Sequence, residues 1–213
     1  MSIIKLSNVT KAYGNKTVLD NLNMEIFPGE FVAVTGASGS GKSTLLNILG
    51  LLEPMDSGTY QILGLDNPRS DSKESVQLLR TKISYLFQNF ALVHERSVAY
   101  NLGIALRFAG VTRSRKKELI AQALRQVGME GFEKKKVFQL SGGEQQRVAL
   151  ARIILKPSEI ILADEPTGSL DFGNRDKVME ILAQLNQEGK TVIVVTHDPN
   201  VEKCAKRVIR LGA

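Results

Sequence analysis

The chain is poor in cysteine and has no long apolar run. Cys204 is the only cysteine among the 213 residues, so no disulfide can form within the chain. This fits a reducing compartment such as the cytoplasm. No segment reaches the roughly 18 consecutive apolar residues that a membrane-spanning helix needs. Residues 1–5 (MSIIK) also lack the apolar stretch of a secretory signal peptide. We therefore expect no membrane-spanning segment.

The chain also lacks internal repeats and low-complexity linkers. Its hydrophobic content of 43% is ordinary for a folded domain. A chain of 213 residues can form one large domain, or one domain with an insert. We therefore expect a single domain over residues 1–213.

The net charge of +6 is concentrated in one segment, residues 101–140, which has nine cations and three anions. The cations are Arg107, Arg113, Arg115, Lys116, Lys117, Arg125, Lys134, Lys135 and Lys136. The anions are Glu118, Glu130 and Glu133. Such a segment is typical of a solvated helical face, or of a surface near an anionic membrane or an acidic partner. Few aromatic residues lie among these charges, which disfavours a nucleic-acid surface, and we expect no nucleic-acid partner.

Short apolar segments alternate with helical patterns along the chain. Phe31–Thr35, Ile160–Ala163 and Thr191–Thr196 read as buried strands. Further strand candidates are residues 3–9, 17–27, 59–63, 83–87 and 208–211. Leucines at helical spacing mark residues 43–52, an amphipathic pattern covers 174–187, and approximately 90–155 is mostly helical. This alternation predicts an α/β fold with a parallel sheet covered on both faces and a helical insert.

Residues 36–43 (GASGSGKS) match the phosphate-binding loop pattern G-x-x-x-x-G-K-[ST] in full. The loop follows a predicted strand and opens a predicted helix, the context that distinguishes it from an ordinary glycine turn. Backbone N–H groups and the helix N-terminus would face phosphates there. Lys42 would reach the β- and γ-phosphates, and the Ser43 hydroxyl would bind Mg²⁺. The nucleotide-binding candidates in this loop are Gly36, Ser38, Gly39, Ser40, Gly41, Lys42, Ser43 and Thr44.

Two acids follow the apolar strand at residues 160–163. Asp164 is a candidate to hold Mg²⁺ through its water shell, because Mg²⁺ takes few protein ligands. Glu165 would lie near the γ-phosphate and accept a proton from the attacking water. By itself this pattern could equally be a strand followed by a polar turn.

Residues 140–147 (LSGGEQQR) combine a small hydroxyl, two glycines and a polar helical stretch. The run is interpreted as a second helix N-terminus that touches phosphate. Two such elements in one small domain suggest a nucleotide held between two copies of the domain. A flexible Ser-Gly-Gly loop is the alternative.

These motifs, in this order, resemble the ATP-binding subunits of ABC transporters over essentially the whole chain. The resemblance implies a P-loop NTPase core with a mostly parallel sheet, an N-terminal antiparallel β subdomain and a helical insert. It also implies that Tyr13 stacks on adenine, although a lone tyrosine is more often structural. Gln88 would touch Mg²⁺ and the attacking water and sense a membrane partner, although a glutamine at a strand end is usually polar surface.

The resemblance assigns further roles around the nucleotide. Ser141, Gly142 and Gly143 would close over the γ-phosphate of the nucleotide on the opposite subunit. Residues 169–171 (SLD) would pass between the two sites, with Asp171 near the nucleotide. His197 would contact the γ-phosphate. His94 matches no motif and is expected at the surface.

The implied assembly contains ATP, Mg²⁺, a second copy of the chain and an integral membrane permease. The homodimer would hold two composite ATP sites at the cytoplasmic face of a bacterial cell membrane, with hydrolysis energising transport. Rival interpretations are a soluble ABC-type ATPase not coupled to transport, a module that binds ATP without cleaving it, and a P-loop kinase.

Some features are similar to the lipoprotein-releasing, macrolide-export and antimicrobial-peptide-export group within that family. They are the short N-terminus, the run at 164–171 (DEPTGSLD) and the early end after Leu211, which predicts no regulatory domain and favours export. Two features depart from the usual pattern. Glu144 replaces the commoner glutamine, and residues 136–139 lack the proline often found before the signature.

Overall fold

Two sheets organise the chain in the computed structural model, which describes residues 1–168 and 172–212, without the side chains of residues 172–174. An antiparallel sheet has the order β2-β1-β4-β5, with β1 Ile4–Tyr13, β2 Lys16–Ile26, β4 Ser57–Ile62 and β5 Leu65–Asp66. A parallel sheet has the order β6-β7-β8-β3-β9. Its strands are β3 Phe31–Thr35, β6 Ile83–Leu86, β7 Ile160–Asp164, β8 Thr191–Val195 and β9 Arg207–Arg210.

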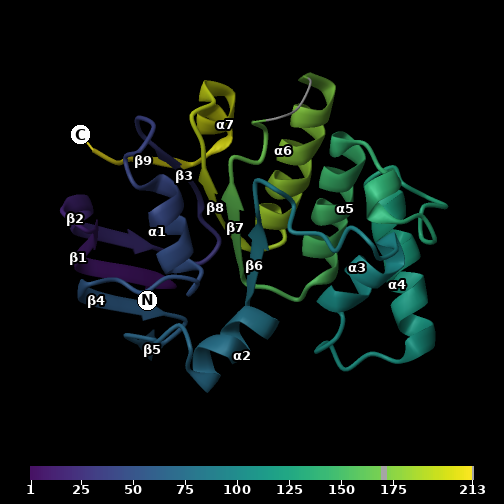
Figure 1. Cartoon of the computed structure of the whole chain (residues 1–213), viewed down its shortest axis with the longest axis horizontal. Helices are drawn as coiled ribbons and strands as arrows, with labels where there is room; N and C mark the ends of the chain where they lie inside the picture. The colour runs from purple at the N-terminus through teal and green to yellow at the C-terminus, as the bar shows by residue number, and fades with distance from the viewer. Residues whose placement is uncertain (169–171, 213) are drawn as a thin grey trace.

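Helices cover the parallel sheet on both faces (Figure 1). They are α1 Lys42–Leu49, α2 Lys73–Thr81, α3 Val98–Ala105, α4 Arg113–Gln126, the 3₁₀ helix η1 Val137–Gln139, α5 Gly142–Leu155, α6 Phe172–Gln187 and α7 Pro199–Cys204. In the part of the chain that the structure describes, no helix has the length and apolarity needed to span a bilayer.

The central strands are buried on both faces, and their alternate residues pack into two different hydrophobic clusters. In β7, Ile160 and Leu162 join a cluster with α1 and the antiparallel sheet. Ile161 and Ala163 join a second cluster with α3, α4, α5 and α6. This is the period-two alternation of an extended strand. Both faces of β7 are therefore fixed, and the direction in which its last residues point is fixed with them.

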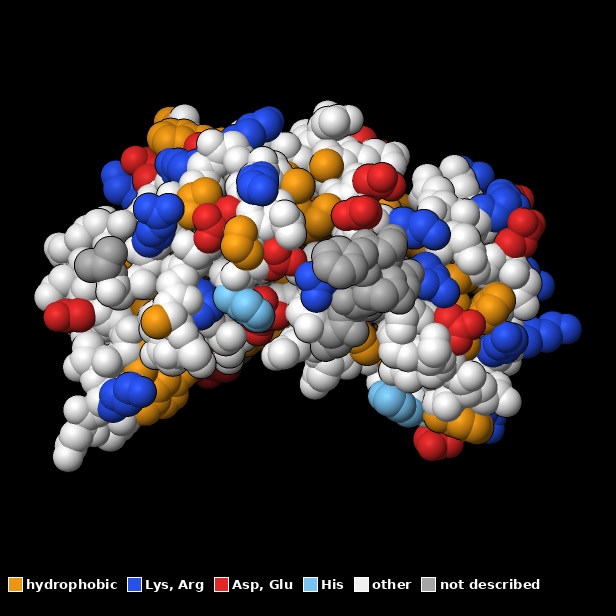
Figure 2. Space-filling view, turned by 90° about the horizontal axis from the view of Figure 1, so that it is seen from above, with side chains coloured by type: hydrophobic (Ala, Val, Ile, Leu, Met, Phe, Trp, Pro, Cys, Tyr) orange, Lys and Arg blue, Asp and Glu red, His pale blue; other side chains and the backbone are white. Residues whose placement is uncertain are grey.

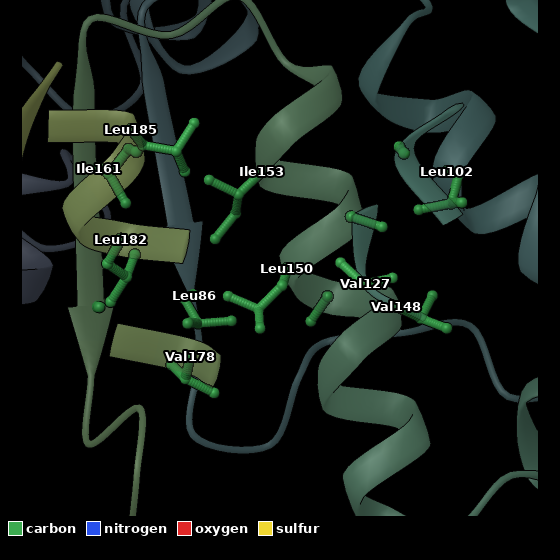
Figure 3. Packing of buried hydrophobic residues seen from close by; sticks show 14 of the residues in the cluster. Leu86, Leu102, Val127, Val148, Leu150, Ile153, Ile161, Val178, Leu182 and Leu185 are labelled. Atoms are coloured by element: carbon green, nitrogen blue, oxygen red, sulfur yellow. The ribbon is translucent and has the colours of Figure 1, made fainter. Parts of the chain in front are cut away.

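Helix α5 lies in the middle of the second core (Figure 3). Leu150 and Ile153 on α5 lie with Leu182 of α6 and Leu86 of β6 among the buried residues of this cluster. On its other side α5 packs against α3 and α4. The rigid packing of α5 sets the position of its N-terminus, where the LSGGEQQR run begins.

The predicted α/β fold, with its parallel sheet and N-terminal antiparallel sheet, is confirmed. Helices α3, α4 and α5 fall within the segment expected to be helical. Helices α2 and α7 were not predicted from the sequence. Each begins at a polar cap, with the side chain of Ser72 accepting from the Ser75 N–H and that of Asp198 accepting from the Asn200 N–H. With nine and six residues, both are shorter than the window of about 11 to 18 residues over which hydrophobic periodicity is judged.

The carboxyl ends of the parallel strands meet at one edge of the sheet. Asp164 at the end of β7 pairs with Val195 at the end of β8, and Val34 of β3 pairs with the same residue. The loop at 36–41 follows β3, Glu165 follows β7 and His197 follows β8. Three motifs far apart in the sequence therefore come together, as is usual for ligand sites in open parallel sheets.

Candidate functional site

The first turn of α1 is left open by its own sequence. Its N-cap, Gly41, has φ 90° and supplies no side-chain cap. A Cβ at this position would lie 2.7 Å from Val18 Cγ1 and 2.8 Å from the Val18 carbonyl oxygen, so only glycine fits here. Uncapped N–H groups and the positive end of the helix dipole favour an anion at this end of α1.

Lys42 is folded back over the loop that precedes it. Its Nζ donates to the carbonyl oxygens of Gly36 and Ala37, both at 2.9 Å. Ser38 and Gly39 at the tip of the loop are exposed. Ser40 Oγ is buried and has no hydrogen-bond partner among the described residues. The loop therefore holds a cation and open donors around a concave backbone, which is suited to phosphate.

Ser43 and Asp164 bring two oxygen atoms together beside this loop. The Ser43 hydroxyl donates to Asp164 Oδ1 at 3.2 Å. Burial is the main cause that raises the pKa of Asp164, and the neighbouring charge of Glu165 raises it further. Within the described chain, no group of three or more His, Cys, Asp or Glu side chains could hold a metal. A hydroxyl and a poorly solvated carboxylate fit a hard cation with few protein ligands, which describes Mg²⁺.

Glu165, which directly follows Asp164, contacts His197. His197 Nδ1 lies 2.8 Å from Glu165 Oε1. Glu165 takes the left-handed conformation, with φ 46°, and its N–H donates to the Val195 carbonyl at 2.9 Å. Its side chain is only 15% exposed, whereas that of His197 is 73% exposed. Glu165 Oε2 is buried and has no hydrogen-bond partner within the described residues.

Figure 2 looks down on this edge of the sheet from above. Acidic and basic side chains and a histidine gather in the middle of that face. His197 and the tip of the loop at Ser38 and Gly39 are exposed at this edge, while strand β8 behind them is buried.

Tyr13 lies at the end of β1, beside the first turn of α1. Its ring is 49% exposed, and its hydroxyl donates to Glu53 Oε1. The hydrogen bond to Glu53 is the main cause that raises the pKa of Tyr13, and the Thr44 side chain is also within hydrogen-bonding reach. An anchored, half-exposed ring next to the loop is available for stacking.

Ser141, Gly142 and Gly143 stand at the start of α5. The Ser141 hydroxyl accepts from the Glu144 N–H at 3.3 Å, and the Glu144 carboxylate accepts from the Ser141 N–H at 2.7 Å. This reciprocal capping box lowers the pKa of Glu144. The Ser141 side chain also lies within hydrogen-bonding reach of the Glu144 carboxylate, which contributes to the lowered pKa of Glu144.

The structure does not bring every predicted site residue together. The α1 loop, Asp164, Glu165 and His197 share one edge, with Tyr13 alongside. The start of α5 lies elsewhere, because α1 packs on β7 and β8 whereas α5 packs on α3, α4, α6 and β6 (Figure 1). Gln88 is exposed two residues beyond β6, and no hydrogen bond within the described chain joins it to Asp164. Asp171 lies outside the described residues.

Gln146 is a residue of the site region that the sequence analysis missed. It is only 4% exposed, and its Nε2 donates to the carbonyl oxygen of Pro166, next to Glu165. It shares the buried face of α5 with Ala149, Leu150 and Ile153. That spacing of three, four and seven residues was the available signal for its burial.

Comparisons with known proteins agree on one family. A family profile described as ABC transporter matches residues 19–168. The chain is 40% identical over 99% of its length to a macrolide export ATP-binding/permease protein MacB of Mannheimia succiniciproducens, and 42% identical over 98% to one of Escherichia coli. It spans 33% of the length of each of these relatives.

Two solved structures are also similar to the chain. One is a dimeric post-hydrolysis state of the ATP-binding cassette MJ0796 bound to ADP and Pi, with TM-score 0.90 and 39% identity. The other is a dimeric structure of MJ0796, a bacterial ABC transporter cassette, with TM-score 0.90 and 41% identity. Each similarity covers 98% of this chain and 94% of the other.

Proposed function

The chain belongs to the ABC transporter family, and we propose that it binds and hydrolyses ATP as one half of a head-to-tail dimer that serves a membrane permease. The observation that carries this proposal is the separation of α1 from the start of α5 within one chain. Each helix N-terminus is suited to phosphate, yet they do not share a site within one subunit. In a dimer with a twofold axis, the N-terminus of α1 from one subunit faces the start of α5 from the other. The symmetry creates two such sites.

The edge around α1 is the half of the site that belongs to the chain itself. Backbone donors from Gly36 to Gly41, with the hydroxyls of Ser38, Ser40 and Thr44, would surround the phosphates. Lys42 would exchange its two carbonyl contacts for the β- and γ-phosphates. Tyr13 would stack on adenine. Asp171 is proposed to lie near the nucleotide as well.

Ser43, Asp164 and Gln88 are the residues that would hold Mg²⁺. When bound, the ion would supply positive charge that offsets the charge of the phosphates. Ser43 would bind it directly through its hydroxyl, and Asp164 through the water shell. Binding would also relieve Asp164, whose carboxylate is held in a poorly solvating environment.

Glu165 is the proposed general base. Its Oε2 is buried without a partner within the described chain, so it is available to accept a proton from water. Its other oxygen is held by His197, which would keep the carboxylate in position and contact the γ-phosphate. Gln88 would help to orient the water. Hydrolysis then depends mainly on positioning and fixed charge.

Ser141, Gly142 and Gly143 would complete the site on the opposite subunit. The Ser141 hydroxyl, which lies at the start of α5 beside the Glu144 carboxylate, would turn to donate to a γ-phosphate. A Cβ at Gly142 would meet nothing within 4 Å, so the packing of the chain does not itself require glycine there. A helix that begins with two glycines forgoes some stability. The absence of side chains at Gly142 and Gly143 would let a nucleotide on the opposite subunit approach the backbone closely.

A groove between α2, β6, α3 and α5 is the proposed docking place for the permease. It has a volume of about 420 Å³ and is lined largely by apolar side chains, among them Leu52, Ile104 and Phe108. These three side chains are exposed, although they are large and apolar. An apolar cytoplasmic segment of a permease would cover them, with the cassette held at the cytoplasmic face of the membrane. The names of the MacB relatives favour export.

Ser141→Arg tests the composite site most simply. The variant should bind ATP like the unmodified chain and lose turnover, because Ser141 would serve only the partner's nucleotide. Ser114→Arg, at an exposed position in α4, is the matched control and should keep turnover. Loss of ATP binding by the Ser141→Arg monomer would contradict the proposal.

A further inference from the structure

A strongly basic surface borders the groove just described. Residues 107–117 contain Arg107, Arg113, Arg115, Lys116 and Lys117 and no acid. The first turn of α4 likewise has no acidic residue. Glu118, just beyond, pairs with Arg115 at 3.0 Å. These like charges repel one another and destabilise the isolated chain. Binding of an external anion would offset this repulsion.

One exposed aromatic side chain, Phe108, lies among these cations. Phe108 is 48% exposed, and the Arg80 guanidinium lies 4.7 Å from its ring centroid, with that of Arg107 at 5.9 Å. Outside the basic segment, the Arg96 guanidinium lies 5.1 Å from the ring centroid of Tyr100 on α3. Aromatic rings flanked by Arg and Lys are typical of surfaces that rest in the polar boundary of a bilayer.

The basic segment and the groove share one side of the molecule. Phe108 lines the groove and also begins the loop that leads to α4. In Figure 1 this loop runs along the bottom edge, on the side of α2, away from the carboxyl ends of the parallel strands. A permease docked in the groove would therefore turn residues 107–117 toward the bilayer. This orientation rests on the proposed function.

We propose that the surface formed by Arg80 and residues 107–117 binds the anionic lipid headgroups around the docked permease. The exposed Phe108 ring, flanked by Arg80 and Arg107 and continuous with the apolar groove, favours a lipid surface over an acidic polypeptide, which would need only the cations. Each Lys or Arg near an anionic membrane contributes about fivefold in affinity. Loss of three cations should therefore weaken binding about a hundredfold, and added salt should weaken it further.

Vesicle co-sedimentation of the purified chain tests the proposal. The probe is vesicles of phosphatidylglycerol mixed with phosphatidylcholine, compared with phosphatidylcholine alone. The chain should bind the anionic vesicles and not the neutral ones. The triple variant Arg107→Gln, Arg113→Gln and Lys117→Gln should lose binding while keeping its circular dichroism spectrum and its ATPase activity in solution.

A second triple variant removes the same charge elsewhere. Lys203, Lys206 and Arg210 are exposed on α7 and near β9, and Lys203→Gln, Lys206→Gln, Arg210→Gln should keep vesicle binding. Equal losses in both triple variants, no binding to anionic vesicles, or a preference for polyglutamate would each overturn the proposal. A chain that binds vesicles but lacks ATPase activity would instead overturn the proposed function.

Discussion

His197 Nδ1 and Glu165 Oε1 lie 2.8 Å apart, although 32 residues separate them in the sequence. The pair depends on the sheet, because Glu165 follows β7 and His197 follows the neighbouring strand β8. The left-handed backbone of Glu165 turns its side chain out of the line of the strand. Backbone strain of this kind is common at functional sites, where it fixes a side chain in one orientation.

Glu165→Gln is expected to bind ATP and to hydrolyse it about 100- to 10,000-fold more slowly. The substitution keeps the shape of the side chain and its contact with His197, but removes the proton acceptor. Phosphate release in single turnover measures the effect. Glu188→Gln, at an exposed position, is the control. Turnover near that of the unmodified chain would show that Glu165 is not the base.

His197→Ala is expected to slow turnover by about 100-fold, because the carboxylate loses its tether and the γ-phosphate loses a donor. If His197 acts through Glu165, the two substitutions will not add, and the double variant will be no slower than Glu165→Gln alone. The exposed His94 provides the control, since His94→Ala should leave turnover unchanged. Fully additive losses would separate the two roles.

Asp164→Asn should stabilise the nucleotide-free protein at neutral pH. Burial raises the pKa of Asp164 above its ordinary 3.8, so the ionised carboxylate costs stability in the folded state. The protonated Asp164 carboxyl contributes favourably to the free energy of folding. This contribution is present in full below pH 3.8 and is lost as pH rises through the pKa of Asp164 in the folded state. The gain from Asn should therefore grow with pH. Thermal melts of both proteins between about pH 3.8 and neutral pH measure the difference in stability.

The same variant should gain less stability from Mg-ATP than the unmodified chain does, because ligand stabilisation follows affinity. Melts with ATP in the presence and absence of Mg²⁺ separate this effect from the change in the free protein. An Asp164→Asn variant that is less stable without nucleotide would contradict the burial argument, and one that is fully stabilised by Mg-ATP would contradict the proposed metal role.

Gln146→Leu should destabilise the chain by about 1–3 kcal/mol, because the buried Pro166 carbonyl loses its donor. For a domain of this size the melting temperature should fall by about 2–4 °C for each kcal/mol. Gln187→Leu, at the exposed end of α6, should change it little. Equal melting temperatures for the two variants would show that the buried hydrogen bond contributes nothing.

The sequence predicts those parts of the fold whose pattern is local. The β-branched run of β8 and the glycine loop before α1 are both of this kind. Helices α2 and α7 were not predicted because each is short, with nine residues in one and six in the other. Hydrophobic periodicity is the main signal for a helix, and it is judged over about 11 to 18 residues, so a shorter helix offers too few positions to establish it.

For the candidate site too, the sequence predicts the features that depend on local motifs and not those that depend on tertiary contacts. Motif spacing predicts Lys42, Asp164 and Glu165 as candidates, but it does not predict which side chains meet. Tyr13 bonds to Glu53 across 40 residues, and Gln146 to Pro166 across 20. Such contacts follow from the packing of whole elements and carry no local signal.

The central claim is that the phosphate loop of one chain and Ser141 of another enclose each ATP. Light scattering during size exclusion tests it most directly, with Glu165→Gln alone and combined with Ser141→Arg. The single variant should be a dimer with Mg-ATP and a monomer without it. The double variant should remain a monomer while still binding ATP. A single variant that stays monomeric at saturating ATP, or a double variant that dimerises, would contradict the claim.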